Sequence, residues 1–165
     1  MFRNILNSSA LILLLMALNN VSMSAQRVDR SSIDTGDEAR IFDLINRERE
    51  RAGLEGLRLS DRLSQFARTY SRQMVRDRLF DHIDRDGNSV VERADRYHIS
   101  GWSKLGENLF YCEPTDQLAG FAVRGWMQSP THRRNILDPD WSATGIGIAV
   151  SRTGEIYITE VFAAG

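Results

Sequence analysis

The residues that follow Ser60 carry the clearest helical pattern of the chain. Apolar side chains recur there at intervals of three and four residues, at Leu63, Phe66, Ala67, Tyr70 and Met74. This spacing places them on one face of an α-helix, and serine is a favoured residue at a helix N-cap. We therefore predict a helix from Ser60 to about Arg78 whose apolar face packs into a core and does not line a ligand site.

The order of the remaining segments favours an α+β fold. Thr35-Gly-Asp-Glu38 has the form of a capping box, and the helix after it is expected to end at Gly53. Helices and strands do not alternate as in βαβ units, so an antiparallel sheet covered by helices is expected. The other expected elements are short helices over Val90–Tyr97, from Pro114 and after Ser129-Pro130, a strand over Gly106–Tyr111, and a hairpin of Gly145–Val150 and Glu155–Ala163.

The N-terminal residues have the pattern of a secretory signal peptide. Arg3 precedes the apolar run Ala10–Leu18, and Ser22 and Ser24 are small residues in front of a cleavage point. Nine apolar residues are too few to span a bilayer, which takes about 20; an uncleaved N-terminal anchor is the alternative. We expect a signal peptide over 1–24, an exposed lead-in over 25–35 and one domain over 36–165.

Composition limits the class of protein and its partners. The chain has 165 residues, of which 42% are apolar and 26% charged, as in an ordinary globular domain. A net charge of −1 provides no overall field for nucleic acid, so we expect no nucleic-acid partner, no transmembrane span and a monomer. Cys112 is the single cysteine, so no internal disulfide forms, which favours a bacterial envelope protein. We expect Cys112 to be buried and inert; a reactive thiol is the alternative.

Two histidines and one glutamate are the candidates for chemistry. His82, Glu107 and His132 form a set that is able to hold zinc with an open coordination position. His132 is expected in the first turn of the helix after Ser129, where the helix dipole favours the neutral imidazole that binds metal. Residues of these types in loops are more often surface or capping residues, and the spacing alone does not bring the three together.

A series of short motifs, taken in order, resembles the CAP superfamily of cysteine-rich secretory proteins, antigen 5 and pathogenesis-related proteins. It is most similar to the cysteine-poor bacterial branch, whose unit is also called the SCP domain, and it extends over about Ala39 to Ala163. The motifs are Asn46-x-x-Arg49, Leu57-x-Leu59, Leu63 with Ala67, Phe80-x-His82, Gly106-Glu107-Asn108-Leu109, Trp126-x-x-Ser129-x-x-His132-Arg133-x-Asn135-Ile136-Leu137, Gly145-Ile146-Gly147 and Phe162-Ala163.

The resemblance implies a three-layer α-β-α sandwich with a central antiparallel sheet and a cleft of two histidines and two acidic residues. His82 and His132 match the histidines, and Glu107 matches the glutamate of the Gly-Glu-Asn motif. Ser129 occupies the other acidic position, so the set of four is incomplete. Glu160 is able to supply the missing carboxylate, but an exposed glutamate on a strand is the favoured interpretation. His98 matches no motif and is expected to be structural or exposed.

The function expected from these observations is that of a secreted or periplasmic, non-enzymatic binding module. Its cleft, formed by His82, Glu107, Ser129 and His132, would hold a divalent metal such as zinc through the two histidines, with Glu107 as a further candidate ligand. An envelope, lipid or protein ligand is equally open, as is a cluster that only braces two loops.

Two enzymatic alternatives remain. In a zinc-dependent hydrolase, His82 and His132 would hold the metal, and Glu107, the candidate catalytic residue, would act as a ligand or as the general base on metal-bound water. A serine hydrolase that uses Ser129 and His132 is least favoured, since a capping serine commits its oxygen to backbone amides and no Gly-x-Ser-x-Gly motif occurs.

Overall fold

The computed structural model describes residues 30–165, with side chains from residue 36. The predicted signal peptide therefore lies outside the described residues. In chain order the elements are α1 (Arg30–Arg51), β1 (Arg58–Leu59), α2 (Asp61–Asp77), α3 (Val90–Arg96), β2 (Lys104–Cys112), α4 (Leu118–Gln128), α5 (Pro130–Ile136), β3 (Ala143–Val150) and β4 (Ile156–Ala164). Within residues 30–165, no helix is both long and apolar enough to cross a membrane.

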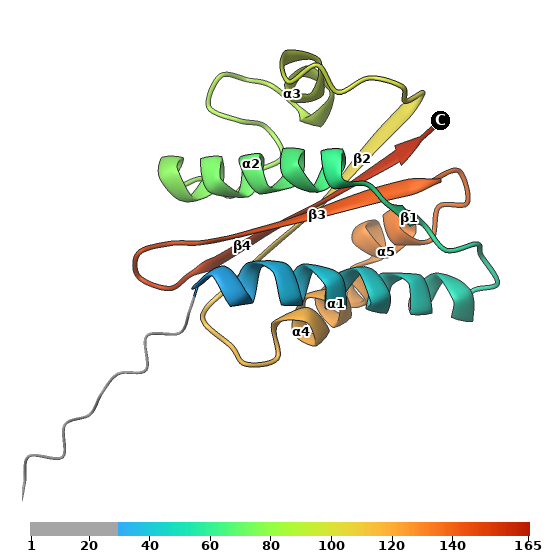
Figure 1. Cartoon of the computed structure of the whole chain (residues 1–165), viewed down its shortest axis with the longest axis horizontal. Coiled ribbons are helices and arrows are strands. Elements are labelled where there is room, and N and C mark those ends of the chain that lie inside the picture. Colours follow the sequence, from blue (N-terminus) through green and yellow to red (C-terminus); the bar gives the residue numbers. More distant parts are fainter. Residues whose placement is uncertain (1–29) are drawn as a thin grey trace, which may run out of the picture.

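The elements form three layers. A four-stranded sheet in the order β1-β3-β4-β2 lies in the middle, with α2 and α3 on one face and α1, α4 and α5 on the other (Figure 1). This confirms the predicted α+β sandwich. The sheet is not wholly antiparallel, because the two-residue strand β1 pairs in parallel with β3, while β3 with β4 and β2 with β4 are antiparallel.

Helix α2 lies directly on strand β3 because two glycines leave room for it. The predicted apolar face of α2 is buried, and Ser60 caps its N-terminus. A Cβ atom at Gly145 would lie 2.2 Å from the Ser64 backbone nitrogen, and one at Gly147 would lie 2.0 Å from that of Arg68. The Gly-Ile-Gly motif is thus explained by the close approach of a helix backbone to the sheet.

The opposite face of the sheet carries the larger core. Trp126 of α4 is fully buried there, and its indole N–H donates to the Leu109 carbonyl of β2 over 2.9 Å. The helix begins at Leu118, four residues after the expected start at Pro114. Phe121 of this helix is 46% exposed. Cys112 is buried as predicted, and burial raises the pKa of its thiol.

Helix α1 begins at Arg30, so Thr35 lies inside it and the predicted capping box is wrong. Glu38 makes tertiary contacts instead. Its carboxylate accepts from Arg68 of α2 at 2.9 Å and from the Ile148 backbone N–H of β3 at 3.1 Å. The Glu38 side chain thus binds α2 and β3, which are distant in the sequence, and does not form a local cap. The predicted end of the helix is confirmed, since Gly53 follows it with a φ of +75°.

The Asn-x-x-Arg motif of α1 braces the loops next to it. Asn46 holds Leu57 by two hydrogen bonds: its Oδ1 accepts from the Leu57 N–H at 2.7 Å, and its Nδ2 donates to the Leu57 carbonyl at 3.1 Å. Arg49 is buried and donates to the carbonyls of Ile136 and Asp138 at 2.7 and 2.9 Å. Arg49 therefore fixes the C-terminal end of α5, the helix that carries His132.

Candidate functional site at the edge of strand β2

The candidate site is built around β2, which forms one edge of the sheet. Successive side chains of a strand point to opposite faces, so Glu107 points toward α2 and α3 while Asn108 points toward α5. Gly106 precedes them because no side chain fits there: a Cβ atom would lie 2.8 Å from the Trp141 ring and 2.9 Å from Oδ1 of Asn135. The Gly-Glu-Asn motif thus places two polar side chains on either side of one edge strand.

Glu107 is held by a histidine and an arginine. Its side chain is only 3% exposed. Oε1 lies 2.9 Å from Nδ1 of His82, and Oε2 pairs with Nη2 of Arg93. The hydrogen bond to Glu107 raises the pKa of His82, although partial burial opposes this. Since Nδ1 of His82 is engaged with the carboxylate, Nε2 is the ring nitrogen left to act on a ligand.

Arg93 is a member of this site that sequence reasoning missed. It lies in α3, whose N-terminus has a complete capping box, and it is 1% exposed. Besides Glu107, its guanidinium donates to the His82 carbonyl at 2.8 Å and lies over the Tyr70 ring, 3.4 Å from the centroid. An arginine in a short polar segment normally indicates a solvated surface. Only the position of α3 against β2 identifies its role.

Two asparagine side chains attach α5 to β2. Nδ2 of Asn108 donates to the His132 carbonyl at 3.3 Å. Nδ2 of Asn135 donates to Oδ1 of Asn108 at 3.1 Å and to the Glu107 carbonyl at 3.2 Å. Both asparagines occur in the motifs of the sequence, but no pattern there revealed that they bond to each other.

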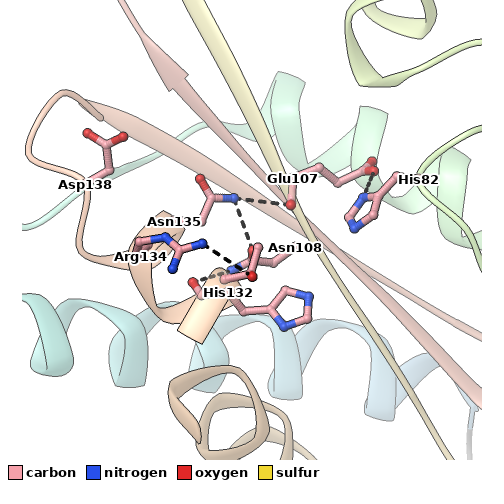
Figure 2. A pocket seen from close by; sticks show the side chains of 8 residues that line it. His82, Glu107, Asn108, His132, Arg134, Asn135 and Asp138 are labelled. Carbon is pink, nitrogen blue, oxygen red and sulfur yellow. Dashed lines mark hydrogen bonds and ion pairs between the residues drawn. The ribbon is translucent and has the colours of Figure 1, made fainter. Parts of the chain in front are cut away.

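His82, Glu107 and His132 line one common cleft of about 380 Å³. Figure 2 shows His82 and Glu107 on one side of β2 and His132 with the two asparagines on the other. The other lining residues are Asn108, Thr131, Arg134, Asn135 and Asp138. Partial burial lowers the pKa of His132, and the nearby His82 lowers it further. The cleft thus joins one imidazole that favours the proton with one that favours the neutral form.

Ser129 is not among the residues that line the cleft. It is the N-cap of α5 by position, and Pro130 follows at N1 as predicted, but its hydroxyl makes no capping hydrogen bond. The expectation that the Ser129 oxygen is committed to backbone amides is therefore wrong.

Asp138 lines the cleft, but it does not supply the second acidic residue, whose position Ser129 occupies. Its Oδ2 accepts from Lys104 at 2.6 Å and its Oδ1 from the Asp140 N–H at 3.0 Å. In the part of the chain that the structure describes, no three His, Cys, Asp or Glu side chains are grouped as metal ligands.

Two further residues lie outside the cleft. His98 is exposed, as expected, with a positive φ of 54°. Glu160 was expected to be exposed, and this is wrong: it is fully buried on β4. The Thr144 hydroxyl lies 3.4 Å from its Oε1. Burial raises the pKa of Glu160 to about 8, although Thr144, Asn108 and the charge of Arg49 oppose the shift. An alternating strand pattern does not reveal a carboxyl on its buried face.

Known proteins share this fold and sequence pattern. The profile of the Cysteine-rich secretory protein family, CAP, matches residues 42–162. The Bacillus subtilis protein named "Uncharacterized protein YkwD" is 32% identical over 114 residues, which are 69% of this chain and 43% of that protein. The chain thus spans less than half the length of this curated relative.

Solved structures agree with the profile. An extracellular protein containing a SCP domain from Bacillus anthracis has a TM-score of 0.71 at 26% identity, over 82% of this chain and 43% of its own. The structure named NaASP2 with Zn²⁺ has a TM-score of 0.59 at 11% identity, over 78% of this chain and 79% of its own. The matched profile, which covers most of the chain, together with the sandwich fold, shows that this chain belongs to the CAP family of cysteine-rich secretory proteins.

Proposed function

We propose that this protein is a secreted or periplasmic, non-enzymatic binding module whose cleft binds a divalent metal through His82 and His132. The observation that carries the proposal is the contact of Glu107 with His82. A buried carboxylate holds Nδ1 of this half-exposed imidazole at 2.9 Å, in a cleft that also contains His132.

The donor set suits a weakly bound, open metal site. A carboxylate that accepts from one ring nitrogen of a histidine fixes its tautomer and orientation, so that the other nitrogen is directed at a metal. Glu107 has this orienting position for His82, and Arg93 neutralises the charge that Glu107 carries. Imidazole nitrogens suit zinc, and a bound zinc ion would act as a Lewis acid toward a ligand. With two imidazoles as protein ligands, the other coordination positions stay open to water or to an envelope ligand.

The relatives support this proposal in two respects. One neighbour with the same fold was solved with Zn²⁺. The Bacillus anthracis neighbour is an extracellular protein, which agrees with the signal peptide expected over residues 1–24.

A zinc-dependent hydrolase has less support from the site. A general base needs a carboxylate oxygen within reach of the bound water. Both oxygens of Glu107 are engaged, one by His82 and one by Arg93, and its side chain is 3% exposed. Orientation of His82 therefore suits Glu107 better than catalysis.

Calorimetry of Zn²⁺ binding to the chain without residues 1–24 tests the proposal. We expect one-to-one binding that is lost in both His82→Ala and His132→Ala and is weakened by about 10- to 100-fold in Glu107→Gln. The matched control is His98→Ala, which removes an exposed histidine outside the cleft and leaves binding unchanged. No binding by the parent protein, or equal loss in His98→Ala, would refute metal binding at this cleft.

A hydrolase assay on the same samples separates the alternative. The binding module shows no turnover of peptide, ester or peptidoglycan substrates with saturating Zn²⁺. Turnover that disappears on chelation and in Glu107→Gln would favour the hydrolase instead.

A further inference from the structure

Glu160 is a buried polar side chain that the metal-binding proposal leaves unused. It is fully buried on β4, and the side chains around it on this face of the sheet form the larger apolar core. Within residues 30–165, its Oε2 has no hydrogen-bond partner. Buried polar groups are normally satisfied, so a carboxyl that is only partly satisfied calls for a physical explanation.

The strand register places Glu160 next to a residue that lines the cleft. Glu160 of β4 pairs with Asn108 of β2. Residues opposite each other in antiparallel strands have their side chains on the same face, with Cβ atoms about 5 Å apart. Asn108 is itself buried, so the two polar side chains form one buried pair between the core and the cleft.

Asn108 connects this buried pair to α5 through two hydrogen bonds. Its amide nitrogen donates to the His132 carbonyl, and its amide oxygen accepts from Asn135. Both partners belong to α5, which has only seven residues and too few internal hydrogen bonds to be stable alone. An amide has two donors and one acceptor oxygen, so Asn108 needs a fixed orientation to serve both contacts at once.

We propose that Glu160 is a positioning residue of the cleft: it fixes the orientation of the Asn108 amide, and Asn108 in turn holds the first turn of α5 and His132 against β2. The side chains of Glu160 and Asn108 lie opposite each other on one face of the sheet and interact. A buried acid at this position prevents the amide from turning away from α5. The relevance of this role for metal binding rests on the proposed function, but the placement of α5 does not.

Amide hydrogen exchange of the full chain, without any metal, tests this inference. The backbone N–H groups of Arg133 and Leu137, which bond to Ser129 and Arg133 within α5, report on the helix. In Glu160→Met, a change of similar volume, we expect their exchange to accelerate at least tenfold relative to amides of α2. In Glu160→Gln, which keeps polar atoms beside Asn108, exchange in α5 stays within about threefold of the parent protein.

The matched control is Thr159→Val. Thr159 is the neighbouring residue on β4, is equally buried, and bonds to Ser71 on the opposite face of the sheet. Its loss should lower protection across the molecule without singling out α5. If Glu160→Met does not fold, Glu160→Asp withdraws the carboxyl from Asn108 and should accelerate exchange in α5 in the same way, to a smaller extent.

Unchanged exchange in α5 in folded Glu160→Met, or the same acceleration in Thr159→Val, would overturn the inference. A parallel titration with Zn²⁺ keeps the two proposals apart. If the parent protein binds no metal but α5 loosens in Glu160→Met, the metal proposal fails and the positioning role stands. If it binds metal and α5 does not loosen, the positioning role fails alone.

Discussion

The buried carboxyl of Glu160 should make the stability of this protein fall as the pH rises. Its pKa is about 8 in the folded chain and 4.5 as an ordinary glutamate. Between these values the folded state keeps the proton while the unfolded state releases it, so ionisation favours unfolding. Stability is therefore highest below pH 4.5 as far as this group is concerned, declines from there to pH 8, and is constant above.

The size of the effect follows from the two pKa values. Each pH unit in this interval is worth about 1.4 kcal/mol. From pH 5 to pH 7.5 the loss amounts to about 3 kcal/mol, a large fraction of the roughly 5–15 kcal/mol that stabilises a typical domain. Glu160→Gln has no proton to lose at this position, so its stability relative to the parent protein should rise by about 3 kcal/mol over the same interval.

Urea denaturation of the two proteins at pH 5.0 and 7.5 measures this change. The comparison is made on the difference between the proteins, since contributions from His82 and other groups are common to both and cancel. The value at a single pH also contains the cost of placing an amide in the core, so the change with pH is the decisive quantity. A difference in stability that is the same at both pH values would refute the account of Glu160.

Three further predictions concern the core and the site. Gly147→Ala should cost about 3 kcal/mol or more in urea denaturation, because its Cβ would lie 2.0 Å from the backbone of α2. Arg93→Ala should cost about 3–5 kcal/mol, since it leaves Oε2 of the buried Glu107 carboxylate without its partner, whereas Arg96→Ala, at an exposed ion pair, should cost under about 1 kcal/mol; equal costs would contradict the pairing. In NMR titrations His82 should titrate above pH 6.5 and His132 below it. Because the folded state raises the pKa of His82, protonation of His82 stabilises the fold below pH 6.5. This stabilisation is lost as the pH rises through the pKa of His82 in the folded chain. Coincident titrations would contradict the contacts described for the two rings.

Local patterns in the sequence predicted those elements that depend on local physics. The stripe from Leu63 to Met74 and the cap at Ser60 are encoded within a few turns of chain, and both are confirmed. The hairpin of β3 and β4 is confirmed for the same reason. The capping box at Thr35 failed because Glu38 finds better partners in α2 and β3, which no local pattern contains.

The candidate site was also predicted only in part. His82, Glu107 and His132 were identified from motifs, and the structure places them in one cleft. Arg93 was missed because a charged side chain in a polar segment gives no sign that it is buried against Tyr70. Glu160 was predicted to be exposed because the sequence shows only that residues alternate along the strand. The strand is flanked by other strands and by helices, so both of its faces are buried.

Side chains form hydrogen bonds with outward backbone groups of β3 and β2. These bonds affect how the sheet can associate with other chains. On β3 the outward N–H groups of Ile146 and Ile148 are taken by Ser64 and Glu38. On β2 the outward carbonyls of Glu107 and Leu109 are taken by side chains of α5 and α4. An exposed strand with free backbone groups is a template for aggregation and for peptides that bind by adding a strand. Since these four groups are already occupied, none of them is available to pair with an added strand.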